Sequence, residues 1–178
     1  MSPEQILDIS RECAASVYGH RPPSAQYAER AAMLLAGTCA TESACVDVRQ
    51  HGYSWDIDLG AWGLWQSEKP AMFDNLIYLT SNNVLCARGM KFAEIEWTAL
   101  QRMGGSSILR CVAASPRLAC LMARVHYLRR PEPIPASVDA QARYWKKWYN
   151  TAKGKGTPEK YMRDFDRLIR PLIEGQLA

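Results

Sequence analysis

The chain has 178 residues, of which 48% are hydrophobic and 22% are charged, and its formal net charge is +4. This balance is typical of a globular protein, and the length suits one domain with its own core, so a largely disordered chain is excluded. No run of about eighteen uncharged apolar residues is present, so no membrane-spanning helix is predicted.

Two helices are predicted in the first quarter of the chain. Ser2, Pro3 and Gln5 favour a helix start, with serine as the N-cap, proline at the first helical position and glutamine reaching back to the cap. Apolar residues then recur at helical spacing until Gly19. An alanine-rich segment from about residue 24 to about residue 41 predicts the second helix, which places Glu42 at or near its C-terminal end.

The rest of the chain is predicted to be helical apart from one strand-like region. Residues 45–60 alternate apolar and polar side chains, which favours short strands or an extended loop. Helical recurrence with Pro, Gly or Asn at the borders is found in residues 70–79, 81–103, 115–130 and 136–151, and Thr157 with Pro158 starts a last helix. We therefore expect a mainly α fold, as a single domain over residues 1–178.

Three alternating prolines in "RRPEPIPAS" predict an extended connector at residues 130–136, because each proline fixes its own φ angle and biases its predecessor away from helix. A recognition ligand for a partner domain is the alternative. The connector leads into a basic C-terminal helical segment, residues 137–178. Within it, residues 143–170 hold nine basic residues and three acids. A surface with this excess of positive charge could face solvent, bind an anionic wall polymer or bind nucleic acid.

The cysteines and histidines point away from disulfides and metals. Six cysteines are present, without a C-x-x-C pair, and most lie in apolar stretches such as "AGTCA" and "NVLCA". Buried reduced thiols are therefore expected, although an even number could also form three disulfides in a secreted protein. The histidines at 20, 51 and 126 are scattered and are not near the cysteines at ligand spacing, so no metal site is predicted.

Three short motifs follow one another in the chain: Glu42-Ser43, the stretch "GAWGLWQ" at residues 60–66, and Tyr149-Asn150 with Gly154 nearby. In this order they resemble the lysozyme-like lytic transglycosylase superfamily, whose members cleave the glycan strands of peptidoglycan. The longer runs "GLWQSEKPAMFDN", "ARVHYLRRPEPIP" and "YWKKWYNTAKGKGT" are similar to members encoded by tailed bacteriophages.

The resemblance implies a lysozyme-like fold, α+β with a minor strand or loop region, and no cofactor. It implies Glu42 as the catalytic residue and peptidoglycan glycan strands as the partner. The implied substrate-binding residues are Ser43, Gly63, Trp65, Gln66, Tyr149 and Asn150.

The residues around Glu42 fit an acid catalyst. Cleavage of a glycosidic bond needs a proton on the leaving oxygen, and a carboxyl held in apolar surroundings stays protonated near neutral pH because burial raises its pKa. The neighbours of Glu42 from Cys39 to Ala44 carry no charge, and the negative end of a helix dipole also disfavours ionisation. The alternative is that Glu42 caps a helix and points to water.

The stretch "GAWGLWQ" is interpreted as a cleft wall. Glycines at 60 and 63 would let the backbone approach a sugar, Trp62 or Trp65 would present a flat face to a ring, and Gln66 would hydrogen-bond to an N-acetyl or hydroxyl group. The resemblance implies that Leu64 and one tryptophan are buried, and that Tyr149 lies near the Glu42 carboxyl. The alternative for "WYNT" is a helix C-terminus with Asn150 as its stop.

The number of carboxylates decides the mechanism. A single glutamate, acting as acid and then as base, suffices for a lytic transglycosylase, whose product as implied by the resemblance is a 1,6-anhydro-muramoyl end. Retaining and inverting glycosidases use two acids, and Asp56 and Asp58 lie where some lysozymes keep the second one. We favour the single-glutamate mechanism and interpret both aspartates as solvated loop residues.

Two other functions are compatible with the sequence. The family usually has small residues or methionine where this chain has Trp62 and Trp65, so a catalytically degenerate protein, structural or adaptor, in contact with other virion proteins is one alternative. A nucleic-acid binder is less favoured, although "RYWKKWYNTAKGKGT" interleaves aromatic and basic residues. Because the N-terminus lacks the pattern of a secretory signal, we expect synthesis in the host cytoplasm and action in the virion or at the bacterial cell wall.

Overall fold

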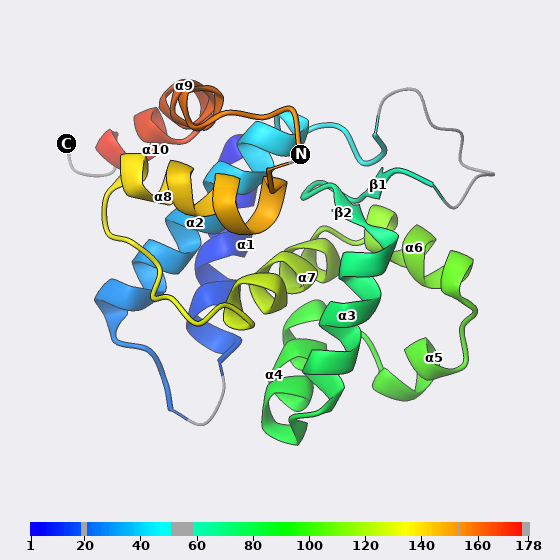
Figure 1. Cartoon of the computed structure of the whole chain (residues 1–178). Helices are drawn as coiled ribbons and strands as arrows, with labels where there is room; N and C mark the ends of the chain where they lie inside the picture. Colours follow the sequence, from blue (N-terminus) through cyan, green and yellow to red (C-terminus); the bar gives the residue numbers. More distant parts are fainter. Residues whose placement is uncertain (19–20, 51–58, 153, 176–178) are drawn as a thin grey trace.

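The structure is a computed structural model that describes residues 1–18, 21–50, 59–152 and 154–175 (Figure 1). Helix α1 spans Pro3–Ser16 and begins as predicted: the Ser2 side chain accepts a hydrogen bond from the Gln5 backbone, and the Gln5 side chain returns one to Ser2. The apolar face of α1, which includes Ile6 and Cys13, is buried.

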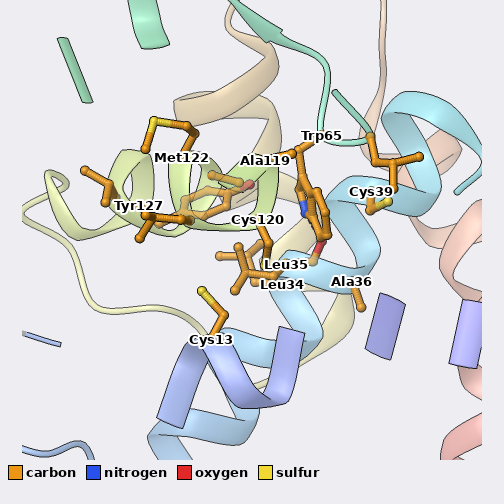
Figure 2. Packing of buried hydrophobic residues seen from close by; sticks show 14 of the residues in the cluster. Cys13, Leu34, Leu35, Ala36, Cys39, Trp65, Ala119, Cys120, Met122 and Tyr127 are labelled. Carbon is orange, nitrogen blue, oxygen red and sulfur yellow. Dashed lines mark hydrogen bonds between the residues drawn. The ribbon is translucent and has the colours of Figure 1, made fainter. Parts of the chain in front are cut away.

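The centre of the domain is formed by α2 (Ala25–Ser43) and α7 (Pro116–Leu128). Every residue of α7 from Leu118 to Tyr127 is buried, so this helix has protein on all sides, and α1 packs along α2 beside it (Figure 1). In Figure 2, Leu34, Leu35 and Cys39 of α2 lie near Ala119 and Cys120 of α7. The prediction of a second helix that ends near Glu42 is confirmed, because α2 continues to Ser43.

A small antiparallel hairpin is formed by β1 (Ala61–Trp62) and β2 (Ser67–Glu68), with Trp62 paired to Ser67. These strands lie inside the stretch "GAWGLWQ" and just after it, beyond the predicted strand or loop region of residues 45–60. In its described part only Arg49 forms a bridge, to Trp62. Residues 51–58, which include Asp56 and Asp58, lie outside the described residues.

Four helices follow the hairpin: α3 (Lys69–Thr80), α4 (Asn83–Ala93), α5 (Trp97–Gln101) and α6 (Gly105–Ala114). The single helical segment predicted for residues 81–103 is wrong, because Glu94 has a φ angle of 57° and ends α4 in the left-handed conformation. Helix α6 was not predicted. It begins at a Gly-Gly pair without a side-chain cap, and a Gly-Gly pair in a sequence predicts a turn, not the start of a helix.

The C-terminal part contains α8 (Val138–Trp145), the π-helix η1 (Lys146–Asn150), α9 (Pro158–Leu168) and α10 (Arg170–Glu174). The predicted start of α9 is confirmed, since the Thr157 side chain accepts a hydrogen bond from the Lys160 backbone. The proline-rich segment joins α7 to α8 and packs on the domain, because Ile134 is buried and the Tyr144 hydroxyl donates to the Glu132 carbonyl.

One cluster of buried apolar residues runs from Ile6 in α1 to Ile169 after α9, so the described residues form a single, mainly α domain. All six cysteines are free; four are buried, while Cys86 and Cys111 are partly exposed. The prediction that most of the cysteines are buried is therefore confirmed. In the part of the chain that the structure describes, no helix is both long enough and apolar enough to cross a membrane.

Candidate active site

A cleft of about 590 Å³ opens beside the C-terminal end of α2. Its lining comes from the last turn of α2, the hairpin, the start of α3, α7, and the chain from Trp145 to Lys160. Five of its polar side chains are central to the chemistry below: Glu42, Gln66, Glu68, Asn150 and Lys160.

Glu42 reaches this cleft from the last turn of α2. The helix ends directly after it, because Ala44 and Cys45 both have left-handed backbones, with φ angles of 51° and 65°. The side chain is partly buried, and the indole N–H of Trp145 donates to its Oε1 at 3.0 Å. Glu42 therefore does not point freely into solvent, which was the alternative for this residue.

Burial raises the pKa of Glu42 from the ordinary 4.5 to about 7. The hydrogen bond from Trp145, the charge of Lys160 and a hydrogen bond from Asn150 lower the pKa, and the charge of Glu68 raises it. Burial outweighs the stabilising contacts, so a large fraction of the Glu42 side chains are protonated at neutral pH. A carboxyl in this state can donate a proton.

Glu68 is a second carboxylate in the cleft, and the sequence analysis missed it. It ends the hairpin at β2, is exposed, and pairs in register with Ala61. The sequence feature that could have indicated Glu68 is its position two residues after Gln66. Residues so close together in one hairpin lie near the same cleft. The two aspartates that were considered instead, at 56 and 58, lie outside the described residues.

Three of the expected substrate-binding residues lie on the cleft: Gln66, Tyr149 and Asn150. Gln66 has a φ angle of 49°, and its amide nitrogen donates to the carbonyls of Asp47 and Gly63, which fixes the side chain. The Tyr149 hydroxyl donates to the Trp65 carbonyl at 2.7 Å and lies 3.3 Å from the Ser67 hydroxyl. Tyr149 is thus bonded to the hairpin, whereas Asn150 lines the cleft with Glu42 and lowers its pKa.

The structure corrects the role expected for the tryptophans. Trp65 is fully buried, and its indole N–H donates to the Leu35 carbonyl of α2 at 2.7 Å. In Figure 2 its ring lies among Leu35, Cys39 and Ala119. Trp62 is also buried, with the Arg49 guanidinium 3.9 Å from its ring centre. Both rings therefore hold the hairpin to the core, and neither presents a face to a sugar.

Ser43 and Gly63 are likewise structural in their contacts and do not line the cleft. The buried Ser43 hydroxyl donates to the Cys39 carbonyl within α2. Gly63 has a φ angle of 74°, and a Cβ there would lie 2.9 Å from the Ala119 Cβ and from the Val112 carbonyl. Its close approach is to α6 and α7, because the hairpin turn sits directly on these helices.

His126 lies in the cleft wall but is not suited to accept a proton at neutral pH. Burial lowers its pKa from 6.5 to about 4, its Nε2 lies 2.7 Å from the Trp148 carbonyl, and its ring packs edge-on against Tyr149. These contacts are those of a packing histidine. Within the described ranges, no group of three or more His, Cys, Asp or Glu residues could hold a metal ion.

Most cations of the basic C-terminal segment are paired. The buried Asp164 forms ion pairs with Lys160, Arg163 and Arg167. The Lys160 Nζ lies 2.8 Å from the Asp164 Oδ2. Three further pairs join Arg143 to Asp139, Lys147 to Glu132 and Arg170 to Asp166. Six cations of this segment are therefore in ion pairs, although they share four carboxylates.

The fold and site together define a mainly α domain with a cleft in which a partly buried glutamate shares the lining with a second carboxylate. No protein-family model, no curated protein and no solved structure matches the chain.

Proposed function

We propose that the protein cleaves the glycan strands of peptidoglycan, with Glu42 as the general acid. The observation that carries this proposal is the Glu42 carboxyl, whose pKa is raised by burial to about 7 while the side chain still lines an open cleft. General acids with a pKa near the working pH are the most effective, because they are protonated and still donate readily.

The proposed fold is lysozyme-like. Its support is the arrangement of three parts: a glutamate at the end of a buried helix, a small hairpin that follows this helix in the chain, and a cleft lined by both. The setting that we propose is the wall of a bacterium attacked by a phage, with the glycan strand as the partner.

The chemistry proceeds with one glutamate. The Glu42 Oε–H donates its proton to the glycosidic oxygen, the bond from that oxygen to the sugar C1 breaks, and the substrate's acetamido oxygen stabilises the positive charge at C1. The Glu42 carboxylate then takes the proton from the C6 hydroxyl of the same sugar, whose oxygen closes on C1. Glu42 ends protonated again, and the product has a 1,6-anhydro end.

Digestion of purified sacculi by the intact protein tests the proposal, with the released fragments separated and weighed by mass spectrometry. We expect soluble fragments that end in 1,6-anhydro-muramic acid, which are lighter by one water than hydrolysed fragments. Reducing ends would instead show that water attacks C1, which is the outcome of the two-carboxylate mechanisms. Absence of any release from about pH 5 to about pH 8 would contradict the proposal, since the acid is protonated over much of this range.

Two substitutions are expected to shift the pH at which the cleavage rate falls, one to lower pH and the other to higher pH. The rate needs protonated Glu42, so it falls as the pH rises through the pKa of about 7. Glu68→Gln removes a charge that raises this pKa, so the fall moves to lower pH; Lys160→Met removes a charge that lowers the pKa, so the fall moves to higher pH. The measurement is kcat/KM against pH at low salt, where exposed charges act most strongly. A shift of both variants in the same direction would show that these charges do not act on the catalytic acid.

A further inference from the structure

A lysine is held at the rim of the cleft between two glycines that have no room for a side chain. A Cβ at Gly154 would lie 2.2 Å from the Asn150 carbonyl oxygen, and a Cβ at Gly156 would lie 2.4 Å from the Trp145 ring. The Trp145 indole also donates to the Glu42 carboxyl, and Asn150 lowers the pKa of that carboxyl. The glycines on both sides of Lys155 therefore pack closely on Asn150 and Trp145, two residues that line the cleft with Glu42.

The approach to this loop is also fixed. Lys146 Nζ donates to the Gly154 carbonyl at 2.8 Å and to Asn150 Oδ1 at 2.9 Å, which ties the π-helix η1 to the loop. Thr151, which directly follows η1, has φ 64° and ψ 172°, a backbone conformation that is costly for a β-branched residue. Strain of this kind persists where the surrounding contacts impose it, and it is frequent at ligand sites. These contacts join η1 to Gly154, the residue that precedes Lys155.

Lys155 differs in its charge environment from Lys160, the other lysine that lines the cleft. It is exposed and lines the same cleft as Glu42. Among the residues that the structure describes, no carboxylate lies within ion-pair distance of Lys155, whereas the neighbouring cleft lysine, Lys160, is paired with Asp164. An unpaired ammonium in the lining of a cleft is available to an anion on the bound ligand.

We infer that Lys155 recognises a carboxylate carried by the lactyl-peptide substituent of the glycan strand, and so selects muramyl strands over neutral strands of the same β-1,4-linked amino sugar. This inference rests on the proposed function for its substrate class. Peptidoglycan carries carboxylates on its peptide stems, or on the lactyl groups once the stems are removed, whereas chito-oligosaccharides carry none. The backbone sugars are otherwise closely similar, so the ammonium of Lys155 adds discrimination that contacts to hydroxyl and acetamido groups do not provide.

The test measures binding, so that it does not depend on cleavage. The Glu42→Gln protein, with and without Lys155→Met, is titrated calorimetrically with three soluble ligands of matched length: strands with peptide stems, strands stripped of stems by an amidase, and a chito-oligosaccharide. Lys91→Met is the matched control, because Lys91 is also an exposed lysine but lies in α4, away from the cleft. Lys155→Arg tests whether charge is the property that matters.

We expect Lys155→Met to weaken binding of at least one carboxylate-bearing strand about three- to fivefold at low salt, the scale of one exposed ion pair. Binding of the chito-oligosaccharide is expected to stay unchanged, Lys155→Arg to retain the affinity, and the effect to shrink at high salt. An effect on the stem-bearing strands alone places the carboxylate on the peptide, and an effect on the stripped strands places it on the lactyl group. Equal affinities of the Lys155→Met protein and its parent for all three ligands would overturn the inference. Tight, Lys155-dependent binding without cleavage by the wild type would instead uphold the inference and remove the proposed activity.

Discussion

Glu42→Gln is expected to lower the rate of glycan release from sacculi by at least about a hundredfold, the low end of the contribution of a general acid. Glutamine has nearly the same shape and can still accept the Trp145 indole N–H, so the cleft should keep its form. What glutamine lacks is a proton that it can give to the leaving oxygen. The measurement is the initial rate of soluble fragment release at neutral pH.

The matched control for this substitution is Glu174→Gln, which removes a carboxyl from the exposed end of α10 without touching the cleft. Its release rate should equal that of the wild type. Equal release by the Glu42→Gln protein would take the catalytic role away from Glu42, whatever the activity of the wild type.

Trp65→Ala is expected to lower the free energy of unfolding by about 3–5 kcal/mol, as for other large aromatic side chains removed from a core. Trp65 is fully buried between α2 and α7, and the substitution also leaves the Leu35 carbonyl without its indole donor. Urea denaturation at constant pH measures the change. This is the behaviour of a residue that anchors the hairpin, and a sugar platform would behave differently.

Trp148→Ala is the comparison, because Trp148 is partly exposed and donates to the exposed Glu132 carboxylate. Its loss should cost clearly less than the loss of Trp65. A loss of stability below about 1 kcal/mol for Trp65→Ala, together with weakened glycan binding, would return Trp65 to the substrate-binding role that the sequence suggested.

The position of Glu42 could be predicted because it depends on local patterns. An alanine-rich helix, a run of uncharged neighbours and the helix end are all visible within about twenty residues, and α2 has the expected course. Helix starts were predicted for the same reason, since the caps at Ser2 and Thr157 are set by residues three positions apart.

The roles of Trp65 and Gly63 could not be predicted, because they depend on what packs against them. A glycine with a positive φ angle accommodates a sugar or a helix equally well, and only the approach of Val112 and Ala119 shows that Gly63 meets helices. The end of the helix at Glu94 could not be predicted for a related reason. Glutamate favours helix by its intrinsic propensity, whereas Glu94 has a left-handed backbone at the C-cap of α4.

The groups that set the pKa of Glu42 were also beyond the reach of sequence patterns. Trp145 and Lys160 lie more than a hundred positions further along the chain, and they meet Glu42 only because α8 and α9 pack on α2. Glu68 is nearer in sequence, but its place at the cleft follows from the hairpin register.

The ionisation midpoint of the Glu42 side chain tests the central claim most directly. Isotope-edited NMR of a protein labelled at the glutamate side-chain carboxyls can follow it, with the Glu42→Gln variant used to assign the resonance. We expect a midpoint at about pH 7, as burial beside Trp145 requires. A midpoint at the ordinary value of 4.5 would contradict the claim that Glu42 holds a transferable proton at neutral pH.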